Sequence, residues 1–275
     1  MTQVAVIGCG IMGSGITFVA RAAGFPVTAV EPGDELAAMA RDRVDRHEAQ
    51  ARKRGVELSD LAPLEMTTDL SAAVTGTDIV VEAVPEDLDL KRAVFAALGA
   101  AAGDETVLAS NTSGLSIEEL GAASGRPSQV VGLHFFTPVP AMRLVEVVRA
   151  PETSDGTVAR GIDFARAVGK ETVEVRDTPG FVTTRLGTLL MCEAIRAYEQ
   201  GVASAEHVDT AMKLGYNHPM GPLELADRVG LDTVLFVLDD LREAYGDAFA
   251  APTLLRRMVD EGKLGRKSGA GFYDY

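Results

Sequence analysis

Three glycines near the start of the chain, in "VAVIGCGIMGSG", have the spacing of a phosphate-binding turn. Gly8, Gly10 and Gly13 form the pattern G-x-G-x-x-G, directly after a short apolar run and directly before a helical pattern that begins at Ile11. The first glycine permits a tight turn, the second lets the backbone approach a pyrophosphate, and the third lets helix and strand pack closely. The first turn of the helix offers unpaired N–H groups and a positive dipole end to the phosphates. The segment fits a dinucleotide-binding turn, although glycines also gather in turns that bind no ligand, so the prediction needs a second residue.

An acidic side chain lies at the distance from this turn at which a ribose is bound. Glu31 ends the second apolar run, "VTAV", eighteen residues beyond Gly13, near the usual spacing of the carboxylate that takes the ribose hydroxyls. The residues after it, "PGDE", contain no cation that could receive a 2′-phosphate, so NAD is favoured over NADP. Ile11 and Met12, which lie between the glycines, and Asn111, in "ASNTSG", complete the predicted cofactor-binding set.

His134, in "VVGLHFF", and Glu146, in "LVEVV", have the types needed for proton transfer. A histidine titrates near neutrality, so it can accept the proton of a hydroxyl group as hydride leaves the same carbon, and a carboxylate partner fixes its tautomer and stabilises the imidazolium. The alternative for His134, which follows an apolar run, is a histidine hydrogen-bonded within the core. The alternative for Glu146, which lies among valines, is a strand residue that faces water.

The composition is that of an ordinary soluble protein and excludes several classes. The 275 residues are 47% hydrophobic and 24% charged, with no apolar run long enough to span a membrane and no export signal at the start. The net charge of -14 argues against nucleic acid, which is bound through accumulated Lys and Arg. Cys9 and Cys192 lie far apart, so we expect two buried thiols, no disulfide and no metal site. A cytoplasmic location is predicted.

One cluster of cations stands out from this acidic background. Arg46, Arg52, Lys53 and Arg54, in "RHEAQARKRG", crowd the end of a predicted helix. They are either solvated side chains that oppose the C-terminal helix dipole or an electrostatic landing site for a phosphorylated substrate.

The elements that must position these residues alternate along the first two thirds of the chain. Short β-branched runs predict strands, and longer Ala-rich stretches predict helices between them. The predicted helices span residues 11–23, 35–54, 88–102 and 156–168. Such alternation is typical of parallel strands joined by crossover helices.

After "VRDTPGFV" the strand patterns stop and one helical pattern follows another. Thr178 followed by Pro179 predicts a helix start, because threonine can cap exposed amides and proline at the first helical position loses no needed donor. The expected fold class is α/β, with a Rossmann-like doubly wound sheet over residues 1–177 followed by an all-α C-terminal domain over residues 178–275.

Several longer motifs resemble those of one enzyme family. They are "SNTSGLSI", "HFFTPVPAMRLVEV", "DTPGFV", "HPMGPLELADRVGLD" and "LGRKSGAGFYDY", and they are spread over the whole chain. With the glycine motif, they make the chain similar to the L-3-hydroxyacyl-CoA dehydrogenases, especially the short bacterial 3-hydroxybutyryl-CoA dehydrogenases. The resemblance implies an NAD-dependent enzyme that interconverts an L-3-hydroxyacyl thioester and its 3-oxoacyl form.

The resemblance also assigns roles to individual residues. It implies that His134 is the catalytic base, that Glu146 is its carboxylate partner, and that Ser113 hydrogen-bonds the reacting oxygen of the substrate. On residue type alone, Ser113 could instead be a turn or helix cap. The resemblance further implies that coenzyme A enters between the two domains and that the helical domain forms a homodimer, whereas His218 is expected to be structural.

Two positions depart from the family pattern. Thr137 and Thr184 stand where the family usually has asparagine, and the second asparagine is an active-site residue that helps to hold the substrate. Thr184 is therefore included among the predicted catalytic residues. Threonine can still donate one hydrogen bond, but it is shorter, β-branched and lacks an amide carbonyl.

These two departures bear on the identity of the substrate more than on the type of reaction. The alternatives are an unusual acyl group, an acyl carrier protein as the carrier in place of coenzyme A, and a free hydroxy acid. Outside the enzyme class, the alternative is a non-catalytic structural protein on the same fold. The presence of Ser113, His134 and Glu146 argues against it.

Overall fold

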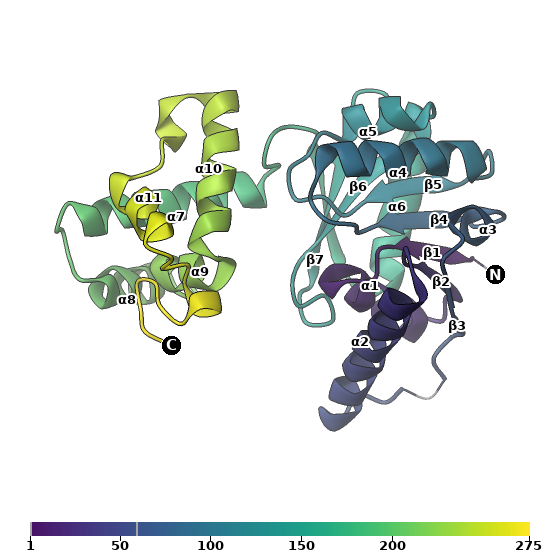
Figure 1. Cartoon of the computed structure of the whole chain (residues 1–275), viewed down its shortest axis with the longest axis horizontal. Helices are drawn as coiled ribbons and strands as arrows, with labels where there is room; N and C mark the ends of the chain where they lie inside the picture. The colour runs from purple at the N-terminus through teal and green to yellow at the C-terminus, as the bar shows by residue number, and fades with distance from the viewer. Residues whose placement is uncertain (1, 59) are drawn as a thin grey trace. The chain divides into compact units, whose positions relative to one another are not determined.

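Contacts between residues divide the chain into two compact units, Met1–Thr178 and Pro179–Tyr275 (Figure 1). The structure is a computed structural model and describes residues 2–58 and 60–275. The division falls one residue beyond the boundary expected after Asp177.

The first unit is built on one eight-stranded sheet. Its strands are β1 (Val4–Ile7), β2 (Val27–Val30), β3 (Leu64–Thr67), β4 (Ile79–Glu82), β5 (Val107–Ser110), β6 (Val130–Phe135), β7 (Leu144–Arg149) and β8 (Glu171–Arg176). They lie in the order β3-β2-β1-β4-β5-β6-β7-β8, and the first six repeat the strand order of a dinucleotide-binding fold. The expected Rossmann-like α/β class is thereby confirmed.

Helices cover both faces of this sheet. They are α1 (Ile11–Ala22), α2 (Asp34–Lys53), α3 (Leu70–Val74), α4 (Leu88–Ala101), α5 (Ile117–Ser124) and α6 (Asp155–Ala167). Side chains of α1, α2 and α6 share one buried apolar cluster with alternate strand residues such as Leu133 and Phe135. Helices α4 and α5 pack together on the opposite side from α1 and α2 (Figure 1). The central strands β1, β4, β5 and β6 are therefore buried on both faces, as parallel sheets require, whereas β3 and β8 at the two edges are partly exposed.

One pair of strands contradicts the expectation of parallel pairing throughout. Strands β6 and β7 run antiparallel. Only residues 136–143 join them, too few for the crossover that a parallel pair needs. Because of this reversal, β7 and β8 begin at the edge of the sheet where β6 ends.

The second unit is helical, as expected. Its helices are α7 (Thr183–Glu199), α8 (Ala205–Gly215), α9 (Pro222–Val229), α10 (Leu231–Tyr245) and α11 (Thr253–Asp260). Short 3-10 turns lie at Asp247–Phe249 and Arg266–Ser268 in this unit, and at Pro127–Gln129 in the first unit. A buried apolar cluster of its own, which includes Ile195, Leu223, Leu231 and Leu238, holds these helices together.

The predicted helix start at Thr178 and Pro179 is wrong. Gly180 and Phe181 have φ angles of 73° and 48°, in the left-handed region that a right-handed helix cannot contain. The chain therefore turns before α7 begins at Thr183. The hydroxyl of Tyr245 donates to the carbonyl oxygen of Pro179 at 3.1 Å and helps to hold this turn.

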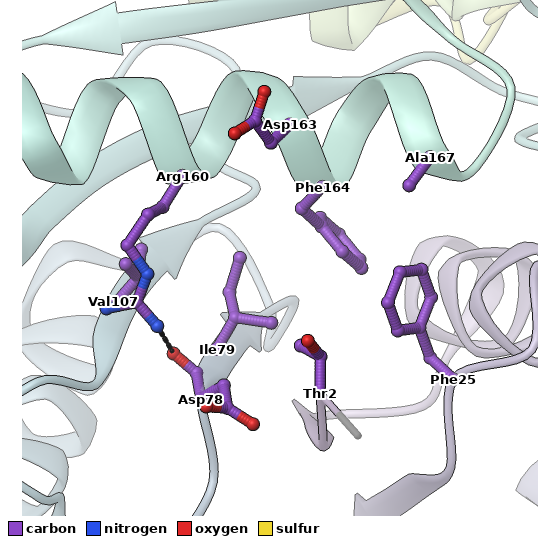
Figure 2. Close-up of a pocket in the computed structure, with 9 residues that line it drawn as sticks. All are labelled: Thr2, Phe25, Asp78, Ile79, Val107, Arg160, Asp163, Phe164 and Ala167. Atoms are coloured by element: carbon purple, nitrogen blue, oxygen red, sulfur yellow. Dashed lines mark hydrogen bonds between the residues drawn. The ribbon is translucent and has the colours of Figure 1, made fainter.

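A pocket of about 400 Å³ lies where β1, β4 and β5 begin (Figure 2). Phe25 and Phe164 form one wall, with ring centroids 5.7 Å apart. Arg160 crosses its far side and donates to the carbonyl oxygen of Asp78 at 2.8 Å. The pocket is thus at the amino-terminal edge of the parallel strands, whereas ligands of such sheets bind at the carboxyl-terminal edge.

Candidate active site

The predicted ligand-binding residues gather at the carboxyl-terminal edge of the sheet. Gly8 follows β1, Glu31 follows β2, Asn111 follows β5, and His134 is the next-to-last residue of β6. Parallel strands bring these positions to one edge although they are far apart in the chain.

Each glycine of the turn has a different environment. Gly8 has a φ of 82°, and a Cβ there would lie 2.9 Å from the carbonyl oxygen of Ala83. A Cβ at Gly13 would lie only 1.9 Å from the carbonyl oxygen of Gly8, so strand and helix meet at these two residues. A Cβ at Gly10 would meet nothing within 4 Å. The protein itself therefore leaves space at Gly10, which fits a turn whose second glycine makes way for a pyrophosphate.

The carboxylate of Glu31 is fixed beside this turn. Its Oε1 accepts a hydrogen bond from the backbone N–H of Cys9 at 2.6 Å, and the side chain is buried. Burial raises the pKa of the Cys9 thiol to about 11, so this thiol stays protonated at neutral pH. Both cysteines are free and buried, as predicted, and no cluster of metal-ligating side chains occurs in residues 2–58 and 60–275.

His134 and Glu146 are joined by the antiparallel pairing of β6 and β7. The two residues are direct cross-strand partners, which places their side chains on the same face of the sheet. Nδ1 of His134 lies 2.8 Å from Oε2 of Glu146. Glu146 is fully buried, so it does not face water. The ring of Phe136 packs against the imidazole, with centroids 4.4 Å apart.

The loop after β5 carries Asn111 and Ser113. Oδ1 of Asn111 accepts a hydrogen bond from the backbone N–H of Phe135 at 3.0 Å, which ties this loop to the strand of His134. The backbone N–H and the hydroxyl of Ser113 both donate to Oε1 of Glu86, at 2.8 and 3.1 Å. Ser113 is thus bonded to Glu86, in the segment between β4 and α4, and lies two residues beyond the asparagine that contacts β6.

Glu86, itself exposed, contacts a buried ion pair that the sequence analysis missed. Nζ of Lys91 lies 2.6 Å from Oε1 of Glu82 and 3.4 Å from Oε2 of Glu86, and the hydroxyl of Ser110 donates to Glu82 at 2.7 Å. Lys91 and Glu82 are almost fully buried. A glutamate that ends an apolar strand, "DIVVE", followed by a lysine nine residues later, was the available signal, because buried charges must be paired.

Thr137, one of the two departures, lies beside the predicted cofactor turn. Its hydroxyl donates to Sδ of Met12 at 2.7 Å. Ile11, the first residue of α1, is instead one of the most exposed apolar side chains, at 75%. In the first turn of α1, the side chain of Ile11 therefore faces outward, and that of Met12 lies against the loop that follows β6.

The other predicted residues are Thr184 and the basic cluster of α2. Thr184 is in the second unit, in the first turn of α7, and is half-buried. Of the basic cluster, Arg52 pairs with Glu48 at 2.9 Å, and the cluster is exposed at the end of α2. No helix in the part of the chain that the structure describes is long and apolar enough to cross a membrane.

Comparison with known proteins gives a consistent result over both units. The model of the 3-hydroxyacyl-CoA dehydrogenase NAD-binding domain matches residues 3–178, and that of the 3-hydroxyacyl-CoA dehydrogenase C-terminal domain matches residues 180–275. A probable 3-hydroxybutyryl-CoA dehydrogenase of Deinococcus radiodurans is 43% identical over 98% of this chain and 99% of its own length.

Two further relatives extend this likeness. Human mitochondrial hydroxyacyl-coenzyme A dehydrogenase is 42% identical over 99% of this chain and 91% of its own length. The crystal structure of (S)-3-hydroxybutyryl-CoA dehydrogenase from Ralstonia eutropha superposes with a TM-score of 0.95 at 37% identity, over 100% of this chain and 99% of that one. With its dinucleotide-binding sheet, its helical second unit and these matches over the full length, the chain belongs to the 3-hydroxyacyl-CoA dehydrogenase family of NAD-dependent oxidoreductases.

Proposed function

We propose that this protein interconverts an L-3-hydroxyacyl-CoA, such as 3-hydroxybutyryl-CoA, and the corresponding 3-oxoacyl-CoA. The observation that carries the proposal is the buried pair of His134 and Glu146, bonded at 2.8 Å, at the same sheet edge as the glycine turn. A base fixed by a carboxylate beside a nicotinamide-binding turn suits the oxidation of a secondary alcohol.

The cofactor is held by the turn and by Glu31. The pyrophosphate would lie against the first turn of α1, over Gly10, because no protein atom would contact a Cβ there and helix N-termini favour anions. Oε1 of Glu31 is bonded to the backbone of Cys9, and Oε2 would accept a ribose hydroxyl. A 2′-phosphate would meet the negative charge of Glu31.

NAD supplies the hydride acceptor, and the side chains handle the proton. Since Nδ1 of His134 is bonded to Glu146, Nε2 is the nitrogen that would accept the proton of the 3-hydroxyl group. The buried charge of Glu146 stabilises the imidazolium that results. In the reverse direction the imidazolium returns the proton to the oxygen as hydride reaches C3. Ser113 would hydrogen-bond that oxygen.

The carrier and the acyl group belong to the proposal as well. The exposed cations at the end of α2 would attract the phosphates of coenzyme A or of a phosphopantetheine arm. An acyl-carrier-protein thioester is the alternative carrier, because it presents the same pantetheine thioester. A homodimer formed through the helical unit, and a cytoplasmic location, are further parts of the proposal that rest on the family resemblance and the sequence.

A turnover screen tests these assignments. NADH oxidation is measured with 3-oxoacyl thioesters of increasing chain length, on coenzyme A and on acyl carrier protein, each also with NADPH. We expect the highest kcat/KM with coenzyme A thioesters and NADH. A higher kcat/KM with the acyl-carrier-protein thioesters would show that the carrier is acyl carrier protein and not coenzyme A. Absence of turnover with every thioester would favour a non-catalytic structural protein.

A further inference from the structure

Residues 136–143 form a loop that connects the strand of His134 to the strand of Glu146. The loop begins at Phe136, whose ring packs against the imidazole of His134. It folds back on itself, because the N–H groups of Ala141 and Met142 both donate to the carbonyl oxygen of Pro138. We call these residues the hairpin loop.

The hairpin loop also contacts the cofactor-binding helix α1 at two points. Thr137 donates to Sδ of Met12 at 2.7 Å. One helical turn further on, a Cβ at Gly15 would lie 2.8 Å from Cβ of Val139, closer than real atoms approach. Gly15, just outside the G-x-G-x-x-G pattern, is therefore required for helix and loop to pack. The loop thus joins the catalytic pair to the element that binds the dinucleotide.

A buried lysine also anchors this loop, in addition to its contacts with His134 and with α1. Nζ of Lys170 donates to the carbonyl oxygen of Val139 at 2.6 Å and to that of Met142 at 2.8 Å. The side chain is 8% exposed, and burial lowers its pKa from the ordinary value. Among the described residues no carboxylate pairs with it. Such a cation is costly to bury, which indicates a specific purpose for its two hydrogen bonds.

Topology explains how a residue so far along the chain reaches the hairpin loop. Lys170 directly precedes β8, which runs parallel to β7 and begins at Glu171, opposite Leu144. Since β7 runs antiparallel to β6, β8 begins at the edge of the sheet where β6 ends. Lys170 therefore lies at the catalytic edge, beyond the far end of the hairpin loop.

We propose that Lys170 is a positioning residue that holds the hairpin loop against α1 and thereby fixes the spacing between the His134 imidazole and the bound nicotinamide. The proposal rests on the dehydrogenase function proposed above. Loss of the ammonium group would leave two loop carbonyls without their donor and let Phe136 and Val139 shift together. A shift of about 1 Å between reacting groups can cost on the order of 10²-fold in rate.

The first test is Lys170→Met, which keeps the length and apolar stem of the side chain but removes the donors. We expect kcat to fall about 10-fold to 100-fold while KM for NADH changes less than about 3-fold. With NADH deuterated at C4, the isotope effect on kcat should rise, because hydride transfer becomes slower relative to product release. Lys170→Arg, which can donate to both carbonyls, should restore part of kcat. Arg166→Met, on the exposed side of α6, is the matched control.

A second variant reaches the same loop from the opposite side. Gly15→Ala must displace Val139 and should give the same fall in kcat and the same rise in isotope effect, even if Lys170→Met does not fold. A folded Lys170→Met protein with the parental kcat and isotope effect would overturn the proposal. So would a Gly15→Ala protein with parental kinetics.

Hydrogen exchange separates this proposal from the proposed function. In Lys170→Met the amides of Ala141 and Met142 should exchange faster than in the parent, with the remaining sheet unchanged. If the parent turns over no thioester, the dehydrogenase assignment fails and with it the catalytic consequence, whereas exchange still decides whether Lys170 holds the hairpin loop. Unchanged exchange would refute the anchoring itself.

Discussion

At the scale of single residues, the acid–base pair separates proton transfer from cofactor binding. His134→Ala removes the proposed base, which lies on β6 and not in the glycine turn between β1 and α1. We expect turnover to fall about 10²-fold to 10⁴-fold, while NADH binding, measured by fluorescence titration, changes little. Glu146→Gln keeps the size of the side chain and loses its charge, so it should also lower kcat. Near-parental activity in His134→Ala would show that another base acts.

We expect one side chain to decide the choice between NADH and NADPH as well. Glu31 is held by the backbone of Cys9 and would repel a 2′-phosphate. The parent should therefore strongly prefer NADH to NADPH. Glu31→Ala should bring the two kcat/KM values closer together, because it weakens NADH binding and removes the charge that repels the 2′-phosphate of NADPH. Equal use of both cofactors by the parent would contradict the role of Glu31.

Thr184 is the residue that best distinguishes this chain from the family pattern. Threonine holds its hydroxyl closer to the backbone than asparagine holds its amide, so acetoacetyl-CoA should be less firmly positioned. We expect low kcat/KM on acetoacetyl-CoA and a gain in Thr184→Asn, alone or combined with Thr137→Asn. High parental activity that falls on introducing asparagine would show that threonine is a competent replacement.

At the scale of elements, the strongly patterned segments were predictable and the weakly patterned ones were not. Strands β1, β2, β4 and β5 are runs of apolar and β-branched residues, and the long helices were predicted within a residue or two of their observed bounds. Strand β3, "LEMT", has no such pattern, because it lies at the edge of the sheet and is only partly buried. Helix α5, which begins at the last residue of the motif "SNTSGLSI", was not among the predicted helices.

The direction of β7 and the start of α7 show a different limit of prediction from the sequence. A strand pattern does not state its direction, so parallel pairing of β6 and β7 was expected, although the short connection between them already excluded it. At Thr178 and Pro179 the local preference for a helix start is overridden by the tertiary turn through Gly180 and Phe181. The contact of Lys170 with the hairpin loop joins residues about thirty positions apart and leaves no local pattern.

The end of the chain is held by a buried aspartate of α9. The carboxylate of Asp227 accepts hydrogen bonds from the N–H groups of Phe272 and Tyr273, both at 3.0 Å, and from the hydroxyl of Tyr275 at 3.2 Å. Burial raises the pKa of Asp227 above its ordinary value of 3.8. The folded state therefore binds this proton more tightly than the unfolded state does.

Asp227→Asn tests this linkage. With the folded pKa raised, the parent gains free energy of unfolding from this group as pH falls from the raised pKa toward 3.8, and loses that gain as pH rises. The variant lacks the titration, so the difference in free energy of unfolding, parent minus variant, should increase toward acid. Urea unfolding from about pH 7 to about pH 4 measures it. A difference that stays flat or shrinks would contradict the shift.

At the scale of the whole molecule, the helical unit exposes large apolar side chains. Leu214 is 82% exposed and Phe236 is 60% exposed, which is costly in water and typical of a surface that another chain covers. We expect the parent to sediment as a dimer and Leu214→Asp to shift it toward monomer. Val56→Asp, at an exposed apolar position of the first unit, should leave the dimer intact. A monomeric parent would contradict the dimer.

The cross-strand pairing of His134 with Glu146 makes the catalytic pair unusually sensitive to length. Side chains alternate between the faces of a strand, so a slip of one residue turns every side chain of β7 to the other face. A single insertion or deletion in the hairpin loop would therefore move Glu146 away from the imidazole without replacing either residue. The distance of twelve residues between the two side chains is thus itself part of the proposed active site.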